Sequence, residues 1–171
     1  MAALSKAALR KRAAKIRCLF LDIDGVLTDG KLYLGPGGAE FKTNDVRDGL
    51  GIKLLLEAGV QVAVISGRPS EAMRQRLAFL GVSHVVLDSE DKLPVYERIC
   101  ARLGLKDEHC AVMGDDVPDL PVMKRAALAL TVADAHPVAH RAAHWVSRYP
   151  GGQGAVREAC DLILAAQGRG L

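Results

Sequence analysis

The sequence has few aromatic residues, no strong excess of one charge and no long apolar run. Half of its 171 residues are hydrophobic, but only one Trp, three Tyr and three Phe are present, so we expect a core of Ala, Leu and Val. A net charge of +3 gives no support for a nucleic-acid-binding surface. No apolar run approaches the ~18 residues that a membrane span needs. The length predicts a single domain over residues 1–171.

The sequence also lacks a CxxC pair, because its four cysteines are far apart. Two of them, Cys18 and Cys110, precede apolar runs. We therefore predict buried free thiols in a reducing compartment, and hence a cytoplasmic protein. The first 17 residues, MAALSKAALRKRAAKIR, are basic and rich in Ala, as in a transit peptide. They run into the first apolar segment without a spacer, which favours a short, exposed basic helix instead.

Residues 18–30, CLFLDIDGVLTDG, contain the most informative pattern. The apolar run 19–21 predicts a buried strand, and two acids one residue apart, Asp22 and Asp24, follow it. Gly25 indicates a turn, so either the side chain or the carbonyl of Asp24 could face a ligand. Two like charges repel unless a cation or a shared proton relieves them, and Mg²⁺ prefers such oxygen ligands. The alternative is a strand-end turn with surface acids.

Apolar strands alternate with helical segments along the rest of the chain. The strands are expected at 61–65, 84–87, 110–113, 127–132 and 145–146, and the main helices at 48–58, 71–79, 92–103, 137–142 and 155–166. This alternation predicts an α/β fold with a mostly parallel sheet and helices on both faces. Residues 31–43, KLYLGPGGAEFKT, predict a β-hairpin inserted after the first strand. Tyr33 and Phe41 would give it an apolar surface, which we expect to pack on another subunit.

Polar residues follow the predicted strands where ligands bind in such sheets, beyond the carboxyl ends. They are Asp22, Asp24, Ser66, Lys92, Asp115 and Asp116. Acids for a metal, a hydroxyl for an anion and one lysine match phosphoryl transfer. Asp22 would be the nucleophile, with Mg²⁺ and Lys92 screening the charges of both reactants. Asp24 would protonate the leaving alcohol and later deprotonate the attacking water.

These residues, as four ordered motifs, resemble those of the haloacid dehalogenase superfamily of phosphohydrolases. The motifs are DIDGVLT at 22–28, SGR at 66–68, Lys92, and GDD at 114–116 with Asp119. The resemblance implies a Rossmann-like three-layer sandwich. It also implies Mg²⁺ held by the Asp22 side chain, the Asp24 carbonyl and Asp115, with Asp116 or Asp119 ordering metal-bound waters. Ser66 and Gly67, in the second motif, and Lys92 would bind the phosphate.

Further segments, including VRDGLGIKLL, GDDVPDLPVM and GGQGAVRE, resemble the 3-deoxy-D-manno-octulosonate 8-phosphate phosphatases of that superfamily. That resemblance covers roughly residues 19–164. It implies a homotetramer that hydrolyses a sugar-acid phosphate in lipopolysaccharide precursor synthesis. A phosphatase of a nine-carbon keto-acid 9-phosphate, such as a sialic acid, and a non-catalytic tetramerisation module of the same fold remain alternatives. A receiver-like phosphoacceptor domain is less favoured, since it would not need Asp24.

The chain has no room for a separate cap domain, because residues 29–43 fit only a hairpin and residues 68–92 only a helix and a strand. Water exclusion must then come from subunit contacts, or the site must accept large substrates. A sugar-acid substrate carries a carboxylate besides its phosphate, so we expect a further cation at the site. Arg68 is the first candidate, and Arg157, which a neighbouring subunit could supply, is the second. Thr28 would reach the substrate only if the hairpin folds back.

Overall fold

A six-stranded sheet forms the centre of the computed structural model, which describes residues 4–170. The strand order is β5-β4-β1-β6-β7-β8, and every pairing is parallel. The strands are β1 (Cys18–Leu21), β4 (Gln61–Ile65), β5 (His84–Val86), β6 (Cys110–Met113), β7 (Leu128–Thr131) and β8 (Trp145–Val146). The predicted α/β fold with a parallel sheet is confirmed.

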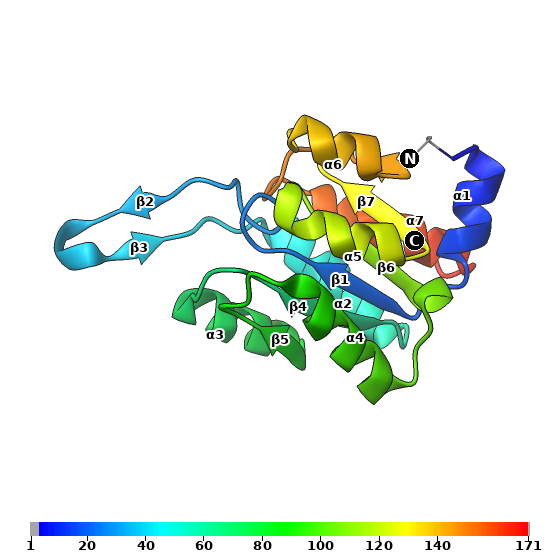
Figure 1. Ribbon diagram of the computed structural model, residues 1–171, viewed down its shortest axis with the longest axis horizontal. Coiled ribbons are helices and arrows are strands. Elements are labelled where there is room, and N and C mark those ends of the chain that lie inside the picture. The colour runs from blue at the N-terminus through cyan, green and yellow to red at the C-terminus, as the bar shows by residue number, and fades with distance from the viewer. Residues whose placement is uncertain (1–3, 171) are drawn as a thin grey trace.

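Helices cover both faces of this sheet and bury a separate core on each (Figure 1). One face packs against α1 (Lys6–Ala13), α2 (Val46–Glu57), α3 (Glu71–Leu80) and α7 (Ala155–Ala166). The other packs against α4 (Lys92–Leu103), α5 (Leu120–Arg125) and α6 (Pro137–Ala142). Successive side chains of a strand point to opposite faces, so Leu19 and Leu21 join the first core and Phe20 joins the second. This explains why the strand is apolar throughout.

The hairpin consists of β2 (Tyr33–Leu34), a 3₁₀ turn (Pro36–Gly38) and β3 (Glu40–Phe41), and it extends away from the body of the molecule (Figure 1). Tyr33 pairs with Phe41, whose side chain is 63% exposed. The predicted hairpin and its apolar surface are confirmed, whereas its packing on another subunit stays a prediction. Within residues 4–170, the segments after β1 and β4 contain no cap domain, as predicted.

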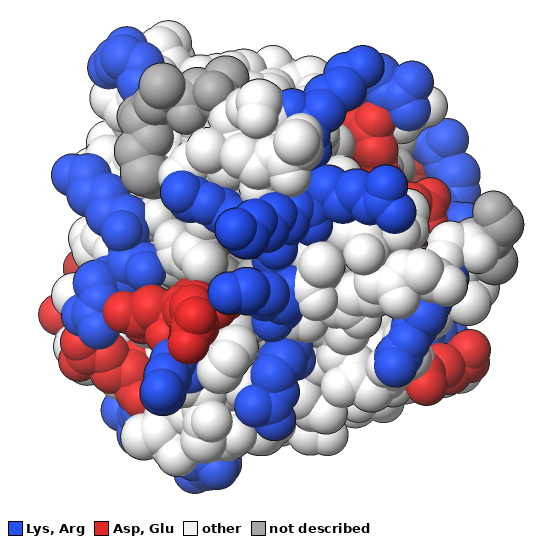
Figure 2. All heavy atoms as spheres, turned by 90° about the vertical axis from the view of Figure 1, so that its right-hand side faces the viewer, with Lys and Arg blue, Asp and Glu red and all other residues white. Residues whose placement is uncertain are grey.

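The basic N-terminal segment forms helix α1, as expected, and residues 1–3 lie outside the described part of the chain. Lys and Arg side chains are numerous on the face that includes this helix (Figure 2). The four cysteines are buried free thiols, which agrees with the prediction. Among the described helices, none is long and apolar enough to cross a bilayer. The short 3₁₀ helices at Asp107–His109 and Val117–Asp119 lie on either side of β6.

Candidate active site

The carboxyl ends of β1 and β4 and the start of α4 open into one pocket of about 350 Å³. Strand β1 lies between β4 and β6, so the residues that follow these strands meet at one edge. The pocket is lined by Asp22, Asp24, Ser66, Gly67, Arg68, Glu90, Lys92 and Pro118. Six of these eight residues are among those predicted for the site. The structure therefore brings the first three sequence motifs together.

Lys92 is the first residue of α4, and its ammonium group contacts two carboxylates. Nζ lies 2.8 Å from Oδ1 of Asp22 and 2.7 Å from Oδ1 of Asp119. The side chain is only 4% exposed. Burial by itself lowers the pKa of Lys92, but the charges of Asp22 and Asp119 outweigh it, so the pKa is raised. The lysine stays charged and partly neutralises the acids around it.

Asp22, Asp115 and Asp119 form a compact acidic group in which one ligand oxygen from each lies within 4.8 Å of the others. Burial raises the pKa of Asp22 to about 7; the charge of Asp119 adds to this shift, and Lys92 opposes it. Burial, with the charges of Asp22 and Asp119, raises the pKa of Asp115 to about 8. These shifts indicate carboxylates whose charges one lysine does not balance. A divalent cation would balance them, and carboxylate oxygens are suitable ligands for one.

The loop around this group explains its geometry. Oδ2 of Asp119 accepts a hydrogen bond from the backbone N–H of Asp115 at 3.0 Å, which fixes the Asp119 side chain. Gly114 packs so closely on Asp119 that a Cβ atom would overlap it. Gly25 has a φ of 88° and lies against the Asp115 carboxylate, so it also leaves no space for a side chain. The acidic group thus depends on two glycines.

The acidic group differs from the metal ligands expected from the sequence. Asp119 is one of its three members, whereas we expected this residue only to order metal-bound water. The Asp24 side chain is outside the group, and its carbonyl stays a predicted ligand. The Asp116 side chain is half-exposed and caps the 3₁₀ turn by accepting a hydrogen bond from the Val117 N–H.

Lys42 is a site residue that sequence reasoning missed. It follows β3 on the returning arm of the hairpin, and its Nζ lies 2.6 Å from Oδ1 of Asp24 and 3.5 Å from Oε1 of Glu40. Glu40 in turn accepts a hydrogen bond of 2.8 Å from Arg68. The available signal was a lysine two residues after an acid in the hairpin. The sequence does not show that this arm folds back onto Asp24.

Ser66 and Gly67 form the turn that follows β4. The Ser66 side chain is buried, and its Oγ accepts a hydrogen bond of 3.2 Å from the Arg68 N–H. Gly67 has only backbone atoms, at 3.9 Å, near the position of a Cβ. Both residues line the pocket, as does the half-exposed Arg68. This placement is compatible with an anion bound at the turn.

Thr28 and Arg157 lie outside the pocket, which differs from the prediction. Thr28 is 1% exposed, and its hydroxyl donates to the Ile23 carbonyl and accepts from the Gly30 N–H at 3.2 Å. This hydroxyl therefore stabilises the loop after β1 and does not face the pocket. The Arg157 guanidinium pairs with Asp161 at 2.9 Å on the same helix. A contribution of Arg157 to the site of a neighbouring subunit stays a prediction.

The glycine-rich segment 151–154 packs directly on the loop that includes Asp24. The Gly152 N–H donates to the Val26 carbonyl at 2.9 Å. A Cβ atom at Gly151 would overlap the Gly25 carbonyl, and one at Gly152 would overlap the Thr28 backbone. Two glycines are thus needed for this close approach of backbone to backbone. The segment therefore packs against the loop after β1 and helps to fix its position.

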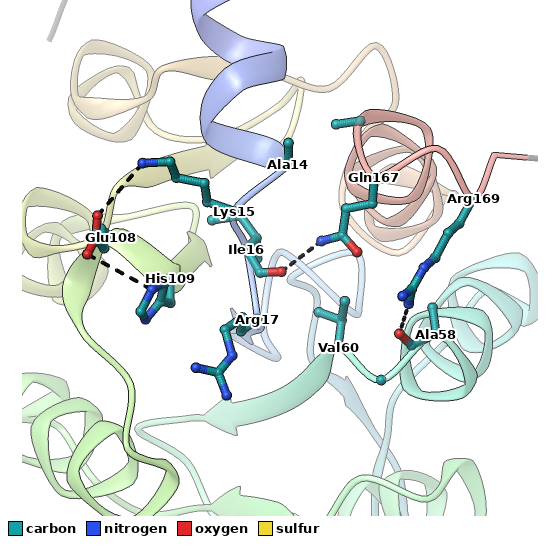
Figure 3. Close-up of a pocket in the computed structure, with 12 residues that line it drawn as sticks. Ala14, Lys15, Ile16, Arg17, Ala58, Val60, Glu108, His109, Gln167 and Arg169 are labelled. Carbon is teal, nitrogen blue, oxygen red and sulfur yellow. Dashed lines mark hydrogen bonds and ion pairs between the residues drawn. The ribbon is translucent and has the colours of Figure 1, made fainter.

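A larger cavity of about 850 Å³ lies at the opposite, amino-terminal end of the strands (Figure 3). Its polar side chains mainly contact the protein itself: Lys15 pairs with Glu108 at 3.9 Å, and Gln167 donates to the Ile16 carbonyl at 2.8 Å. Among the residues drawn there, Glu108 is the one carboxylate. This cavity therefore offers no acidic group comparable with that of the smaller pocket, which we take as the candidate active site.

Known proteins resemble this chain over most of its length. The 3-deoxy-D-manno-octulosonate 8-phosphate phosphatase KdsC of Yersinia pestis is 46% identical over 92% of this chain and 84% of its own. A crystal structure of the Yersinia pestis phosphatase matches with a TM-score of 0.93 and 45% identity, and covers 95% of this chain and 88% of the other. The phosphatase from Moraxella catarrhalis, solved with magnesium ion, phosphate ion and KDO, matches with a TM-score of 0.94 and 35% identity, and covers 96% and 94%.

A family model agrees with these relatives. Residues 39–127, about half of the chain, match the haloacid dehalogenase-like hydrolases. The match includes Ser66, Lys92 and the acidic residues after β6, which the structure places at one end of the sheet. Sequence, geometry and similarity thus lead to the same conclusion, that the chain belongs to the haloacid dehalogenase-like hydrolase family.

Proposed function

We propose that this protein is a Mg²⁺-dependent phosphatase that hydrolyses 3-deoxy-D-manno-octulosonate 8-phosphate through an aspartyl-phosphate on Asp22. The observation that carries the proposal is the 46% identity to a phosphatase of that name over 92% of the chain. The pocket supports it with a carboxylate nucleophile, a buried lysine and an acidic group that fits a divalent cation. A relative that was solved with magnesium and phosphate ions is consistent with the choice of metal.

The acidic residues fit Mg²⁺ by their chemistry. Asp22 and Asp115 would hold it with carboxylate oxygens, and the Asp24 backbone carbonyl would be the third protein ligand. Asp119 would stabilise the arrangement through the Asp115 N–H and Lys92. When bound, the ion would neutralise phosphate charge and allow an anionic nucleophile to approach.

The residues of the chain then divide the reaction into two steps. In the first, an Asp22 oxygen forms a bond to phosphorus while the bond to the sugar oxygen breaks, and Asp24 gives its proton to that oxygen. In the second, Asp24 takes a proton from a water that attacks phosphorus, and the Asp22–phosphorus bond breaks. Lys92 and the turn at Ser66 hold the phosphoryl oxygens in both steps.

Arg68 is our candidate for the carboxylate of the substrate. It lines the pocket, is half-exposed, and pairs with Glu40 at 2.8 Å. Arginine binds a carboxylate through two parallel hydrogen bonds, so it suits this role. We expect the Arg68→Met variant to raise KM for the sugar-acid phosphate while phosphate release from an aryl phosphate changes little.

The nine-carbon keto-acid 9-phosphates remain the alternative substrates, since the phosphate-binding residues would be shared. Purified protein should be assayed for phosphate release from both substrate classes, with and without Mg²⁺. A preference above about tenfold in kcat/KM, some 1.4 kcal/mol of differential transition-state binding, decides between them. No release from any sugar-acid phosphate would refute the proposal and favour the non-catalytic module.

The role of Asp24 has a separate test based on leaving groups. An Asp24→Asn variant should lose most kcat/KM on the sugar phosphate, whose alkoxide leaves poorly without a proton, and less on an activated aryl phosphate. Because kcat/KM reports only the steps up to departure of the leaving group, equal losses of kcat/KM on both substrates would show that Asp24 does not transfer this proton.

We also infer a cytoplasmic homotetramer, with residues 1–171 as one domain, that works in lipopolysaccharide precursor synthesis. The exposed apolar hairpin, including Leu34 and Phe41, supports association between copies, and the buried free thiols suit a reducing compartment. Light scattering on the purified protein tests the oligomer. A Phe41→Lys substitution should weaken association if the hairpins form the interface.

A further inference from the structure

The contact between Lys42 and Asp24 has no role in the reaction described above. The Lys42 side chain is 2% exposed, and its Nζ donates a hydrogen bond of 2.6 Å to Oδ1 of Asp24. Lys31, on the outgoing arm of the same hairpin, is by contrast 72% exposed. A surface lysine normally keeps its ammonium group in water, and burying that group is costly unless carboxylates compensate it. Lys42 is therefore not an ordinary solvated charge.

The partners of Lys42 form a small network that fixes the carboxylate of Asp24. Glu40 lies 3.5 Å from Lys42 and accepts a hydrogen bond from Arg68, so two cations and two carboxylates alternate. In this network Oδ1 of Asp24 accepts the hydrogen bond from Lys42. The other oxygen, Oδ2, is buried and has no hydrogen-bond partner among the described residues.

Oδ2 is also the Asp24 oxygen that lies nearer to Arg68, with 3.9 Å to its Nε, and both residues line the pocket. A buried acceptor without a partner is rare in proteins and calls for an explanation, of which a catalytic role is one. The two oxygens of Asp24 thus differ in their contacts: Oδ1 is held by the hairpin, and Oδ2 lacks a hydrogen-bond partner among the described residues.

We propose that Lys42 is a positioning residue that holds Asp24 by Oδ1 so that Oδ2 meets the leaving oxygen of the substrate. The inference rests on the proposed function, because it assumes that Asp24 transfers the proton. Lys42 keeps its own proton in both steps and touches no reacting atom. A carboxylate that rotates freely would be displaced from the leaving oxygen for part of the time, and small misplacements of a catalytic group are expensive in rate.

Kinetics on two substrates test the proposal with a matched pair of variants, Lys42→Met and Lys31→Met. On the sugar-acid phosphate, Lys42→Met should lower kcat/KM, which reports the steps up to departure of the leaving group, by about 10- to 100-fold. On p-nitrophenyl phosphate, which needs no proton at its leaving oxygen, kcat/KM should fall less than about threefold. Lys42→Arg should recover part of the loss. Lys31→Met, made in the same hairpin, should behave as the wild type.

A double variant shows whether Lys42 acts through Asp24. If it does, Asp24→Asn with Lys42→Met should be no slower on the sugar-acid phosphate than Asp24→Asn alone, because the group to be positioned is already lost. If the double variant instead shows the product of the two single-variant losses, Lys42 does not act through Asp24. Circular dichroism should establish that each variant folds. If Lys42→Met does not fold, Lys42→Gln, which keeps hydrogen-bond donors, is used in its place.

The outcomes separate this inference from the proposed function. A wild type that releases no phosphate from either substrate overturns both. An active wild type overturns the positioning role alone if Lys42→Met retains its kcat/KM on the sugar-acid phosphate, loses it equally on both substrates, or loses it through KM alone. A loss confined to the sugar-acid phosphate, absent in Lys31→Met and masked by Asp24→Asn, supports it.

Discussion

Replacing Asp22 by Asn should abolish turnover and at the same time stabilise the metal-free protein. An amide has nearly the shape of the carboxylate but is a poor nucleophile, so no aspartyl-phosphate would form. The gain in stability has a different cause. Burial and the neighbouring Asp119 raise the pKa of Asp22 from 3.8 to about 7, so the charged form is unfavourable in the folded protein.

The size of this gain follows from proton linkage. Between pH 3.8 and about 7 the folded protein holds a proton that the unfolded chain has lost. As the pH rises through that interval, each pH unit lowers the free energy of unfolding of the wild type by about 1.4 kcal/mol. The total loss is at most roughly 4 kcal/mol. The introduced amide does not titrate, and Lys92 keeps Asp119 as a partner at 2.7 Å in the variant. We expect the Asp22→Asn variant to be more stable than the wild type by about 2–4 kcal/mol at pH 8 and nearly equal at pH 4.

Urea denaturation of chelator-treated protein at pH 4, 6 and 8 measures this difference. Asp161→Asn is a suitable control, because Asp161 lies in a surface ion pair with Arg157 and its removal should cost about 0–1 kcal/mol. Mg²⁺ should narrow this difference, since a ligand at 100 times its Kd stabilises the wild type by about 2.7 kcal/mol and the variant has lost a ligand group. A metal-free variant that is less stable than the wild type at pH 8 would refute the argument from charge repulsion.

Other perturbations of the site have equally defined outcomes. Lys92→Met should lower the free energy of unfolding of the metal-free protein by about 3–5 kcal/mol, as measured by urea denaturation, because it leaves Asp22 and Asp119 without their buried cation. The affinity for Mg²⁺ should fall as the pH decreases from 8 to 6, because protons on Asp22 and Asp115 compete with it; calorimetry in two buffers should detect proton release. Gly151→Ala should lower both the melting temperature and kcat, since its Cβ would displace the loop of Asp24.

The strands and the polar residues at their ends could be predicted because both depend on local pattern. Each strand is a short apolar run that ends at a polar or glycine residue, and parallel pairing then places these ends at one edge. Gln61–Ile65, Lys92–Leu103 and Cys110–Met113 have the predicted bounds. The approach of Asp22 to Lys92 follows from this arrangement alone.

Contacts that depend on how loops fold back could not be predicted in this way. Lys42 and Asp24 are 18 positions apart in the sequence. No residue pattern specifies the direction of the hairpin that brings their side chains together. The fourth motif includes Asp119 but does not show which side chain it contacts, and only the turn after β6 places it against Lys92. Thr28 has a hydroxyl that the sequence cannot assign to the pocket or to the loop. In the structure Thr28 is buried under segment 151–154, so its hydroxyl stabilises the loop.

In the proposed mechanism, the hairpin would do part of what a cap domain does. A closing domain brings side chains to the substrate and holds the acid/base group in place. Here Glu40 and Lys42, on the returning arm, contact Arg68 and Asp24, which line the pocket. Glu40 and Lys42 flank the exposed Phe41, and Glu40 pairs with the exposed Leu34, so the polar contacts and the apolar side chains share one stretch of the hairpin. Any protein surface that binds these apolar side chains would therefore act on the same element that contacts Asp24, so association and catalysis should be coupled in this chain.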